Sequence, residues 1–427
     1  MKKYTLFHAL YGASLGAAQR SYVIKSSVNS NEVLDGFVSF SIEFSSFPDF
    51  AALYNAPLPY ALNGTRAIKA LLAEHCPELV ETNETYGYLG PLFAGVNNRL
   101  KEAAAWAAGI NADKSIKLFS TYNYISGSTS PGVTLQGTLM NHTTTKRSVD
   151  AHITEYNKIK SVDPSVPPLI FGEANSLYNQ GKPGLSNSFG AALWSSILTS
   201  TTAASASNAS TCTWAPTTAV DDSRVMGTRA LYYGNIAVAA MMGNLVRQPV
   251  SIVEIPLADS ERKAAYAAYT NSGETLVRFM VINLNAYNTT VDGAGQVPLP
   301  DPAVRQPAVE YRFTVPDAAP AVRTGPDEKM RVVKIQRLLT NGSDAITGIT
   351  WDGWSYNYEL AGGKPATLGN VTVGETVEVC EDGNVNVTVP WSSAALLDFS
   401  GCDDHEGDSG GDGDVLKDRE NEMVGWD

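Results

Sequence analysis

Basic side chains are scarce in this sequence of 427 residues. Lys and Arg number 31 against 44 Asp and Glu, which gives a formal net charge of −13. The last 26 residues, 402–427, hold ten acidic and two basic side chains, so the first 401 residues carry only −5. A weakly acidic body without a basic stripe cannot neutralise many phosphates. We therefore expect no nucleic-acid partner.

Cysteine and histidine are also few. The four Cys and five His show no paired spacing of the kind that zinc ligands have, so we predict no metal centre and no cofactor. Four cysteines cannot form the main scaffold of so long a chain. Cys380 and Cys402 are close enough in sequence to form a disulfide, whereas Cys76 and Cys212 are either free or bridged.

Long apolar runs are missing beyond the N-terminus. No other stretch reaches the roughly 20 apolar residues that span a bilayer, so we expect no membrane anchor in the mature chain. Lys2 and Lys3 precede a mainly apolar run, residues 4–15, and three small residues follow it. We interpret residues 1–18 as a secretory signal peptide that is removed. An ordinary N-terminal strand or helix is the alternative, but no amphipathic repeat supports it.

Asn-x-Ser/Thr sequons are frequent. Each is weak evidence alone, but together with the signal peptide they predict a secreted, extracellular glycoprotein. The eight candidate glycosylation sites are Asn63, Asn83, Asn141, Asn208, Asn288, Asn341, Asn370 and Asn386.

The sequence changes character near residue 249. Hydrophobic residues make up 44% of the chain, enough for two domains with their own cores. In residues 19–248, short apolar runs alternate with helical periodicity, which is typical of a βα protein. Residues 249–401 alternate in the β pattern between turn-rich clusters and predict a β-sandwich. The acidic segment 402–427 has the ligand spacing of no calcium loop, and we predict a disordered tail.

Local patterns predict several elements of the first domain. Residues 36–44 and 116–124 are strand candidates, and the apolar spacing in residues 149–159 predicts a helix that ends at Asp163. Ser188 is a candidate cap for a following helix. The polar, low-complexity segment 195–219 is expected to be the least organised part of this domain.

Glu173 stands at the end of a buried strand. The apolar run 169–171 stops at Gly172 and Glu173, as a strand buried on both faces would. The carboxyl ends of parallel barrel strands point into the active site, where an acid can meet a substrate. A glutamate in a strand-to-helix loop, capped by backbone amides, is an equally good interpretation of the spacing alone.

Four segments resemble fungal glycoside hydrolase family 79, the β-glucuronidase and heparanase relatives. The segments are FGEANSLYNQGKPGLSNSFGAALW (171–194), GFVSFSIEFSSFPDF (36–50), SPGVTLQGTLMNHT (130–143) and YYGNIAVAAMMG (232–243). The resemblance implies an α/β plus all-β protein, with a (β/α)8 TIM-barrel-like catalytic domain and a C-terminal β-sandwich. It also implies retaining hydrolysis of β-linked glucuronic acid, with glucuronic-acid-containing glycans as the partners.

The resemblance also implies roles for individual residues. Glu173 matches the nucleophile, Glu43 would bind sugar hydroxyls, Tyr124 would hydrogen-bond the nucleophile, and Tyr178, Gln180 and Gly181 match the turn that holds the uronate carboxylate. A hydroxyl and backbone amides can accept that anion without placing a full positive charge beside the nucleophile. For Tyr124 and Tyr178, an aromatic of the core or rim is the alternative interpretation.

The second carboxylate is missing. A retaining glycosidase needs a carboxylic acid about 5 Å from the nucleophile, and the family places it in an Asn-Glu-Pro motif. This sequence has no such motif, so the acid/base stays unassigned. The family's Arg-x-Gly-Gly segment is absent as well. Asn83-Glu84 is the sole Asn-Glu in the expected region, and we interpret it as a surface loop because Thr85 follows it.

Length arithmetic indicates internal deletions in the barrel. Residues 45–115 separate the first strand from the one resembling the sixth, whereas the four intervening strands would need well over about 100 residues, at roughly 30 for each βαβ unit. We therefore predict an incomplete barrel. Two functions stay open: a β-glucuronidase-like hydrolase, and a catalytically inactive secreted carbohydrate-binding glycoprotein or truncated relic.

Overall fold

The computed structural model describes most of the chain from residue 88 onward and short segments before it. The described residues are 21–28, 33, 38–40, 88–97, 101–112, 114, 116–179, 181–205, 211–213, 228–245, 247–270, 273–293, 297–300, 307–316, 322–324, 330–369 and 371–400. The predicted signal peptide (1–18), the acidic tail (402–427), Glu43 and Gln180 lie outside these ranges. Within them, no helix is long and apolar enough to cross a membrane.

A parallel sheet forms the first structural unit. Its described strands follow the order β2-β6-β5-β4-β3, and every pair is parallel. The strands are β2 (Val38–Phe40), β3 (Tyr88–Phe93), β4 (Ile116–Gly127), β5 (Leu169–Tyr178) and β6 (Thr211–Thr213). The earliest strand lies beside the latest, as in a (β/α) barrel. Residues 41–87, between edge strands β2 and β3, lie largely where the deletions are predicted and outside the described residues.

Helices connect the parallel strands. They are α4 (Glu102–Ala107), the π-helical turn η2 (Leu135–Leu139), α5 (His142–Val162), α6 (Phe189–Ser205) and α7 (Ala230–Met242). The side chain of Asn141 caps α5 by accepting a hydrogen bond from the Thr144 amide at 2.9 Å. The helix ends at Asp163, which precedes a proline, as the sequence predicts. Its buried face, including Val149 and Tyr156, packs toward the sheet.

Helix α6 contradicts one sequence expectation. The segment 195–219 is predicted to be poorly organised, but α6 runs to Ser205 and β6 follows it, in the place where the barrel needs its next strand. The small side chains serve close packing, because a Cβ atom on Gly234 of α7 would lie 2.4 Å from the Ala192 carbonyl oxygen. Ser195 Oγ donates to Asn235 Oδ1 across the same contact. The small side chains of α6 therefore allow close packing against α7.

The start of α6 differs from the sequence prediction as well. Ser188 is predicted to cap this helix, but its hydroxyl donates to the Leu185 carbonyl at 2.7 Å. The amides of Phe189 and Gly190 donate instead to the carbonyls of Ala345 and Ser343, both at 2.8 Å. Because residues 343–345 lie more than 150 positions downstream, local sequence could not reveal this cap.

The rest of the chain forms a large, mostly antiparallel sheet that curls on itself. Its path runs β1-β10-β17-β16-β12-β18-β9-β8-β7, and β11, β13, β14 and β15 branch from it. The strands are β1 (Ser21–Val23), β7 (Ser251–Glu254), β8 (Lys263–Thr270), β9 (Thr275–Asn283), β10 (Ala308–Thr314), β11 (Val322–Thr324), β12 (Met330–Leu339), β13 (Thr350–Trp351), β14 (Trp354–Ser355), β15 (Ala366–Thr367), β16 (Glu375–Val379), β17 (Asn384–Pro390) and β18 (Ser393–Asp398), with short helices η4 (Val291–Gly293) and α8 (Tyr358–Ala361). The bend lies at β12, which pairs with both β16 and β18.

Strand β1 joins this sheet rather than the parallel one. It pairs in parallel with β10, and Ile24 lies buried in the core enclosed by the curled sheet. The sequence interpretation puts residues 19–248 in the barrel domain, so the described segment 21–28 departs from that boundary. Edge pairing depends on which distant strand is available, and three residues of sequence carry no such information.

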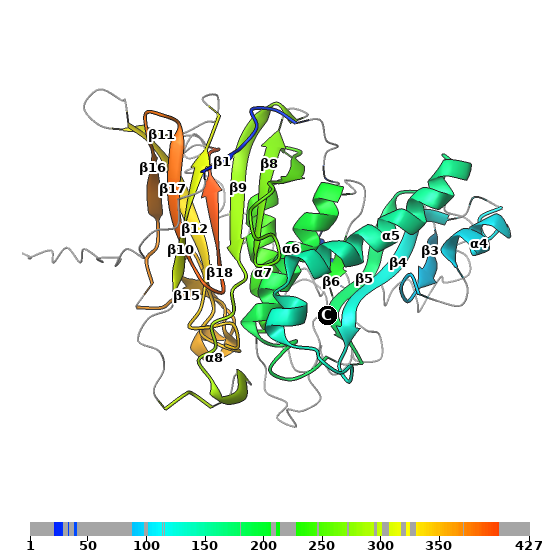
Figure 1. Cartoon of the computed structure of the whole chain (residues 1–427), viewed down its shortest axis with the longest axis horizontal. Helices are drawn as coiled ribbons and strands as arrows, with labels where there is room; N and C mark the ends of the chain where they lie inside the picture. Colours follow the sequence, from blue (N-terminus) through cyan, green and yellow to red (C-terminus); the bar gives the residue numbers. More distant parts are fainter. Residues whose placement is uncertain are drawn as a thin grey trace, which may run out of the picture.

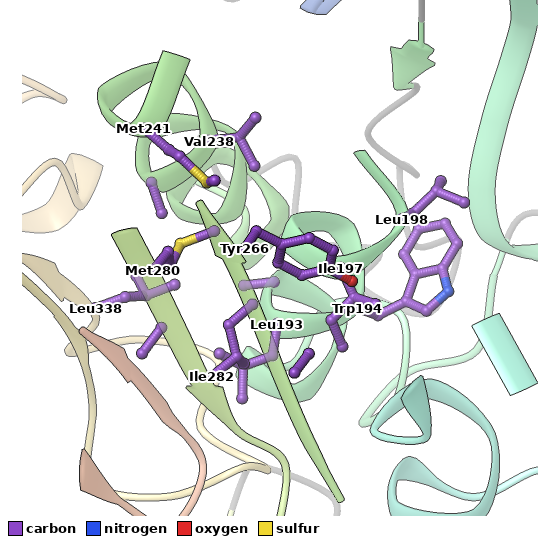
Figure 2. Close-up of a cluster of buried hydrophobic side chains, with 14 of the residues drawn as sticks. Leu193, Trp194, Ile197, Leu198, Val238, Met241, Tyr266, Met280, Ile282 and Leu338 are labelled. Atoms are coloured by element: carbon purple, nitrogen blue, oxygen red, sulfur yellow. The ribbon is translucent and has the colours of Figure 1, made fainter. Parts of the chain in front are cut away.

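The core is continuous between the two sheets. Helices α6 and α7 lie between the parallel strands and the large sheet (Figure 1). Figure 2 shows Leu193 and Ile197 of α6, Met241 of α7 and Met280 of β9 in one cluster of buried hydrophobic side chains. Strand β9 is buried on both faces, because Met280 packs toward these helices while Phe279 faces the inside of the curled sheet. This explains its nearly unbroken apolar sequence.

The cysteine predictions stay open. Cys380 is exposed after β16, while Cys402 and Cys76 lie outside the described residues, as does the side chain of Cys212.

Candidate active site

The candidate site lies on β4 and β5, which are parallel and point toward the same end of the molecule (Figure 1). The sequence predicts that Glu173 ends its strand, but β5 continues to Tyr178 and Glu173 lies in its middle. Glu173 of β5 is half-buried, and Tyr124 Oη of β4 donates a hydrogen bond to Glu173 Oε1. Tyr122 pairs with Glu173 in the strand register. Alternate residues of a strand share a face, so Tyr122 and Tyr124 both lie on the Glu173 side.

The opposite face of β4 turns toward α5. The Asn123 side chain accepts a hydrogen bond from Ser148 of α5 at 2.6 Å, and Thr121 lies 3.2 Å from His152 Nδ1 of the same helix. This alternation separates the face on which Glu173 lies from a helix-packed face.

The electrostatics around Glu173 favour the protonated form of Tyr122. Burial raises the pKa of Tyr122, and the negative charge of Glu173 raises it further. Tyr122 therefore stays a neutral hydroxyl near the carboxylate across the physiological pH range. Sequence reasoning missed this residue, although its alternation with Tyr124 could have identified it.

Tyr178 is the last residue of β5, and Gly181 lies in the turn that follows this strand. Tyr178 is 46% exposed, and its ring meets the Tyr124 ring edge-on with the centroids 6.3 Å apart. Asn179 has a φ of 60° and Gly181 a φ of 75°, both in the left-handed region. The structure thus brings Tyr124, Glu173 and Tyr178 together. Glu43 and Gln180, outside the described residues, cannot be placed relative to them.

Glu102 is a buried carboxyl group that could be mistaken for the missing acid. Burial raises its pKa to about 7, a value suited to a general acid. However, Thr121 Oγ1 lies 3.0 Å from Glu102 Oε1 on the helix-packed face of β4. Glu102 therefore lies on the wrong side of the sheet to protonate a group bound at Glu173, and the acid/base stays unassigned. Within the described ranges, no cluster of His, Cys, Asp and Glu is arranged to hold a metal ion.

Comparison with known proteins finds similarity to one family. Residues 265–396, from β8 into β18, match the glycosyl hydrolase family 79 C-terminal beta domain. The chain is 49% identical over 365 residues to a β-glucuronidase of Neurospora crassa, covering 79% of this chain and 64% of that protein. A β-glucuronidase of Aspergillus niger is 47% identical over 349 residues, covering 79% of this chain and 60% of that protein. The family model and both relatives show that the chain is similar to glycosyl hydrolase family 79.

These similarities confirm the resemblance to family 79 found in the sequence. The chain spans less than two thirds of the length of both curated relatives. Among solved structures, it is similar in fold to a 4-O-α-L-rhamnosyl-β-D-glucuronidase from Fusarium oxysporum. That match has a TM-score of 0.50 and 18% identity, and it covers 73% of this chain and 58% of the other. This similarity supports the order of parallel strands followed by a large curled sheet.

Proposed function

We propose that this chain is a secreted glucuronidase-type glycoside hydrolase that removes β-linked glucuronic acid from glycans with retention of configuration. The observation that carries the proposal is Glu173, which lies in the middle of the interior parallel strand β5 and accepts a hydrogen bond from Tyr124 of the neighbouring strand. The catalytic domain is then an incomplete (β/α)8-type barrel, and the curled sheet is a β-sandwich.

The proposed chemistry follows from this geometry. The ionised Glu173 carboxylate attacks the anomeric carbon, the bond to the leaving oxygen breaks, and a glycosyl-enzyme forms that water later hydrolyses. The Tyr124 hydroxyl orients the carboxylate through its hydrogen bond. The Tyr178 hydroxyl and the amides of the turn around Gly181 hold the uronate. No acid that would protonate the leaving oxygen is assigned among the described residues.

A substrate with a good leaving group tests the proposal. An aryl β-glucuronide of low leaving-group pKa needs little acid assistance, so the site should still become glycosylated. Hydrolysis of the glycosyl-enzyme lacks an assigned base, and we expect intact-mass spectrometry to show an accumulating glucuronyl adduct with slow release of the aryl alcohol. An aryl β-glucoside is the matched control and should give no adduct.

The absence of the Asn-Glu-Pro motif favours a second candidate. A catalytically inactive carbohydrate-binding glycoprotein would bind glucuronate without forming an adduct. A truncated relic would show neither binding nor an adduct. Either result with the aryl glucuronide would contradict the hydrolase.

Four described sequons make secretion testable. Asn288, Asn341 and Asn386 are exposed, whereas Asn141 is 7% exposed and donates from Nδ2 to Glu261 Oε1 at 2.8 Å. A glycan on Asn141 would have to enter a packed contact between α5 and the large sheet. We therefore expect secreted protein to carry glycans at the three exposed positions and none at Asn141.

Peptide mapping after enzymatic deglycosylation in heavy-oxygen water measures this pattern, because each glycosylated Asn becomes a labelled Asp. Three unlabelled exposed sequons in protein purified from the medium would contradict the expectation. A labelled Asn141 would contradict the packing at the start of α5.

A further inference from the structure

The residue that follows β4 forms hydrogen bonds with the end of β5 and with the turn after it. The amide of Ser128, the first residue after β4, donates to the Tyr178 carbonyl at 3.1 Å. The hydroxyl of the same serine donates to the Asn179 carbonyl, also at 3.1 Å. One residue thus binds two successive carbonyls of the turn.

These two bonds set the direction of the turn's amides. A peptide group is planar, with its C=O and N–H on opposite sides. Because the Tyr178 carbonyl points at Ser128, the Asn179 amide points away from β4. Asn179 also adopts a left-handed conformation, with a φ of 60°, which residues other than glycine adopt rarely. Turns with left-handed residues can present their amides together toward an anion.

Gly127 leaves the space in which the Tyr178 ring packs. The two residues are register partners across β4 and β5. A Cβ atom on Gly127 would lie 2.4 Å from Tyr178 Cζ and 2.6 Å from Tyr178 Oη. The ring therefore occupies space that any other residue at position 127 would fill. Tyr124 contacts the same ring edge-on, so Tyr178 is confined between a glycine and the residue that hydrogen-bonds Glu173.

We propose that Gly127 and Ser128 are positioning residues that determine selectivity for a uronic acid over the corresponding neutral sugar. Gly127 sets where the Tyr178 hydroxyl lies, and Ser128 sets where the turn's amides point. Both groups meet the C6 carboxylate of the sugar, which is the one feature that distinguishes glucuronate from glucose. The inference rests on the proposed function, since it requires a uronate at this site.

The test compares D-glucuronate with D-glucose on the full chain. Dissociation constants are measured by NMR titration for the wild type, Ser128→Ala, Gly127→Ala and the conservative variant Ser128→Thr. Ser130→Ala is the matched control, because its described contact with Gly127 comes from the backbone amide and survives the substitution. Thermal unfolding of each variant checks that the fold is retained.

We expect Ser128→Ala and Gly127→Ala each to weaken glucuronate binding about tenfold and to leave glucose binding unchanged. Ser128→Thr should restore binding because it keeps the hydroxyl, and Ser130→Ala should match the wild type. Equal glucuronate affinity in all variants would overturn the inference and leave the proposed function intact. Equal losses for both sugars would reveal a merely structural role and overturn it too. A wild type that binds no glucuronate would overturn the proposed function and the inference with it.

Discussion

Replacing Glu173 with glutamine should lower turnover of an activated aryl β-glucuronide by at least about a thousandfold. The amide has the same shape and can still accept the hydrogen bond from Tyr124, so the site should keep its geometry. The neutral amide cannot supply the electron pair that forms the glycosyl-enzyme. Initial rates of aryl alcohol release measure the effect, and the glucuronyl adduct should disappear in the same variant.

Glu310→Gln is the matched control for this substitution. Glu310 is an exposed glutamate on β10, far in the fold from β4 and β5. Its variant should turn over substrate at the wild-type rate. Unchanged turnover in Glu173→Gln would remove Glu173 from the mechanism.

The second large effect concerns a buried cluster on the helix-packed face of β4. Thr121 Oγ1 lies 3.0 Å from Glu102 Oε1, 3.2 Å from His152 Nδ1 and 3.3 Å from the Phe93 carbonyl oxygen. A hydroxyl has one hydrogen to donate, so it cannot donate to all three acceptors. The Phe93 carbonyl can only accept, so the other two contacts each need a hydrogen, one from Glu102 and one from His152 Nδ1. The geometry therefore favours a protonated Glu102 and a neutral His152 that carries its hydrogen on Nδ1.

Burial shifts the two titrating groups in opposite directions. Burial, with a smaller contribution from Glu155, raises the pKa of Glu102 from 4.5 to about 7, although the Thr121 hydrogen bond and Lys101 oppose the shift. Burial lowers the pKa of His152 from 6.5 to about 4. Between pH 4.5 and 6.5 the unfolded chain holds an ionised Glu102 and a charged His152, whereas the folded chain holds both neutral.

The two groups therefore have opposite effects on stability. The folded state keeps a proton on Glu102 that the unfolded state releases, so this residue lowers the free energy of unfolding as pH rises from 4.5 to 7. The unfolded state keeps a proton on His152 that the folded state releases, so this residue raises the free energy of unfolding as pH rises from 4 to 6.5. The two slopes cancel in the overlapping range.

Single substitutions should uncover each slope. Relative to the wild type, the free energy of unfolding of Glu102→Gln should rise by about 2 to 3 kcal/mol between pH 4.5 and 7, because the variant loses the Glu102 contribution. Relative to the wild type, that of His152→Gln should fall by about 2 to 3 kcal/mol between pH 4 and 6.5, because the variant loses the His152 contribution. Urea unfolding at a series of pH values measures both differences. Parallel curves for the wild type and both variants would contradict the buried, neutral pair.

Local patterns in the sequence predict the elements that carry the site. Strand β5 follows from the apolar run that stops at Glu173, and helix α5 from its apolar spacing and its stop before proline. Such elements are predictable because burial of one face or both imposes a period on a short segment.

Contacts between distant segments could not be predicted in this way. Nothing in the sequence around Ser128 indicates that it binds the carbonyls of a turn 50 residues later, and Gly127 has no φ that requires glycine. The carbonyls that cap α6 come from residues 343–345 of the large sheet. The second half of α6 could not be predicted because a loop and a closely packed helix pair are both rich in small polar residues.

Identification of the glucuronylated residue tests the central claim most directly. The chain is incubated with the activated aryl β-glucuronide, digested, and sequenced by tandem mass spectrometry. We expect the glucuronyl group on Glu173, in the peptide that continues through Tyr178. A glucuronyl group on another residue, or substrate turnover with Glu173 unlabelled at every time point, would contradict the assignment of Glu173 as the nucleophile.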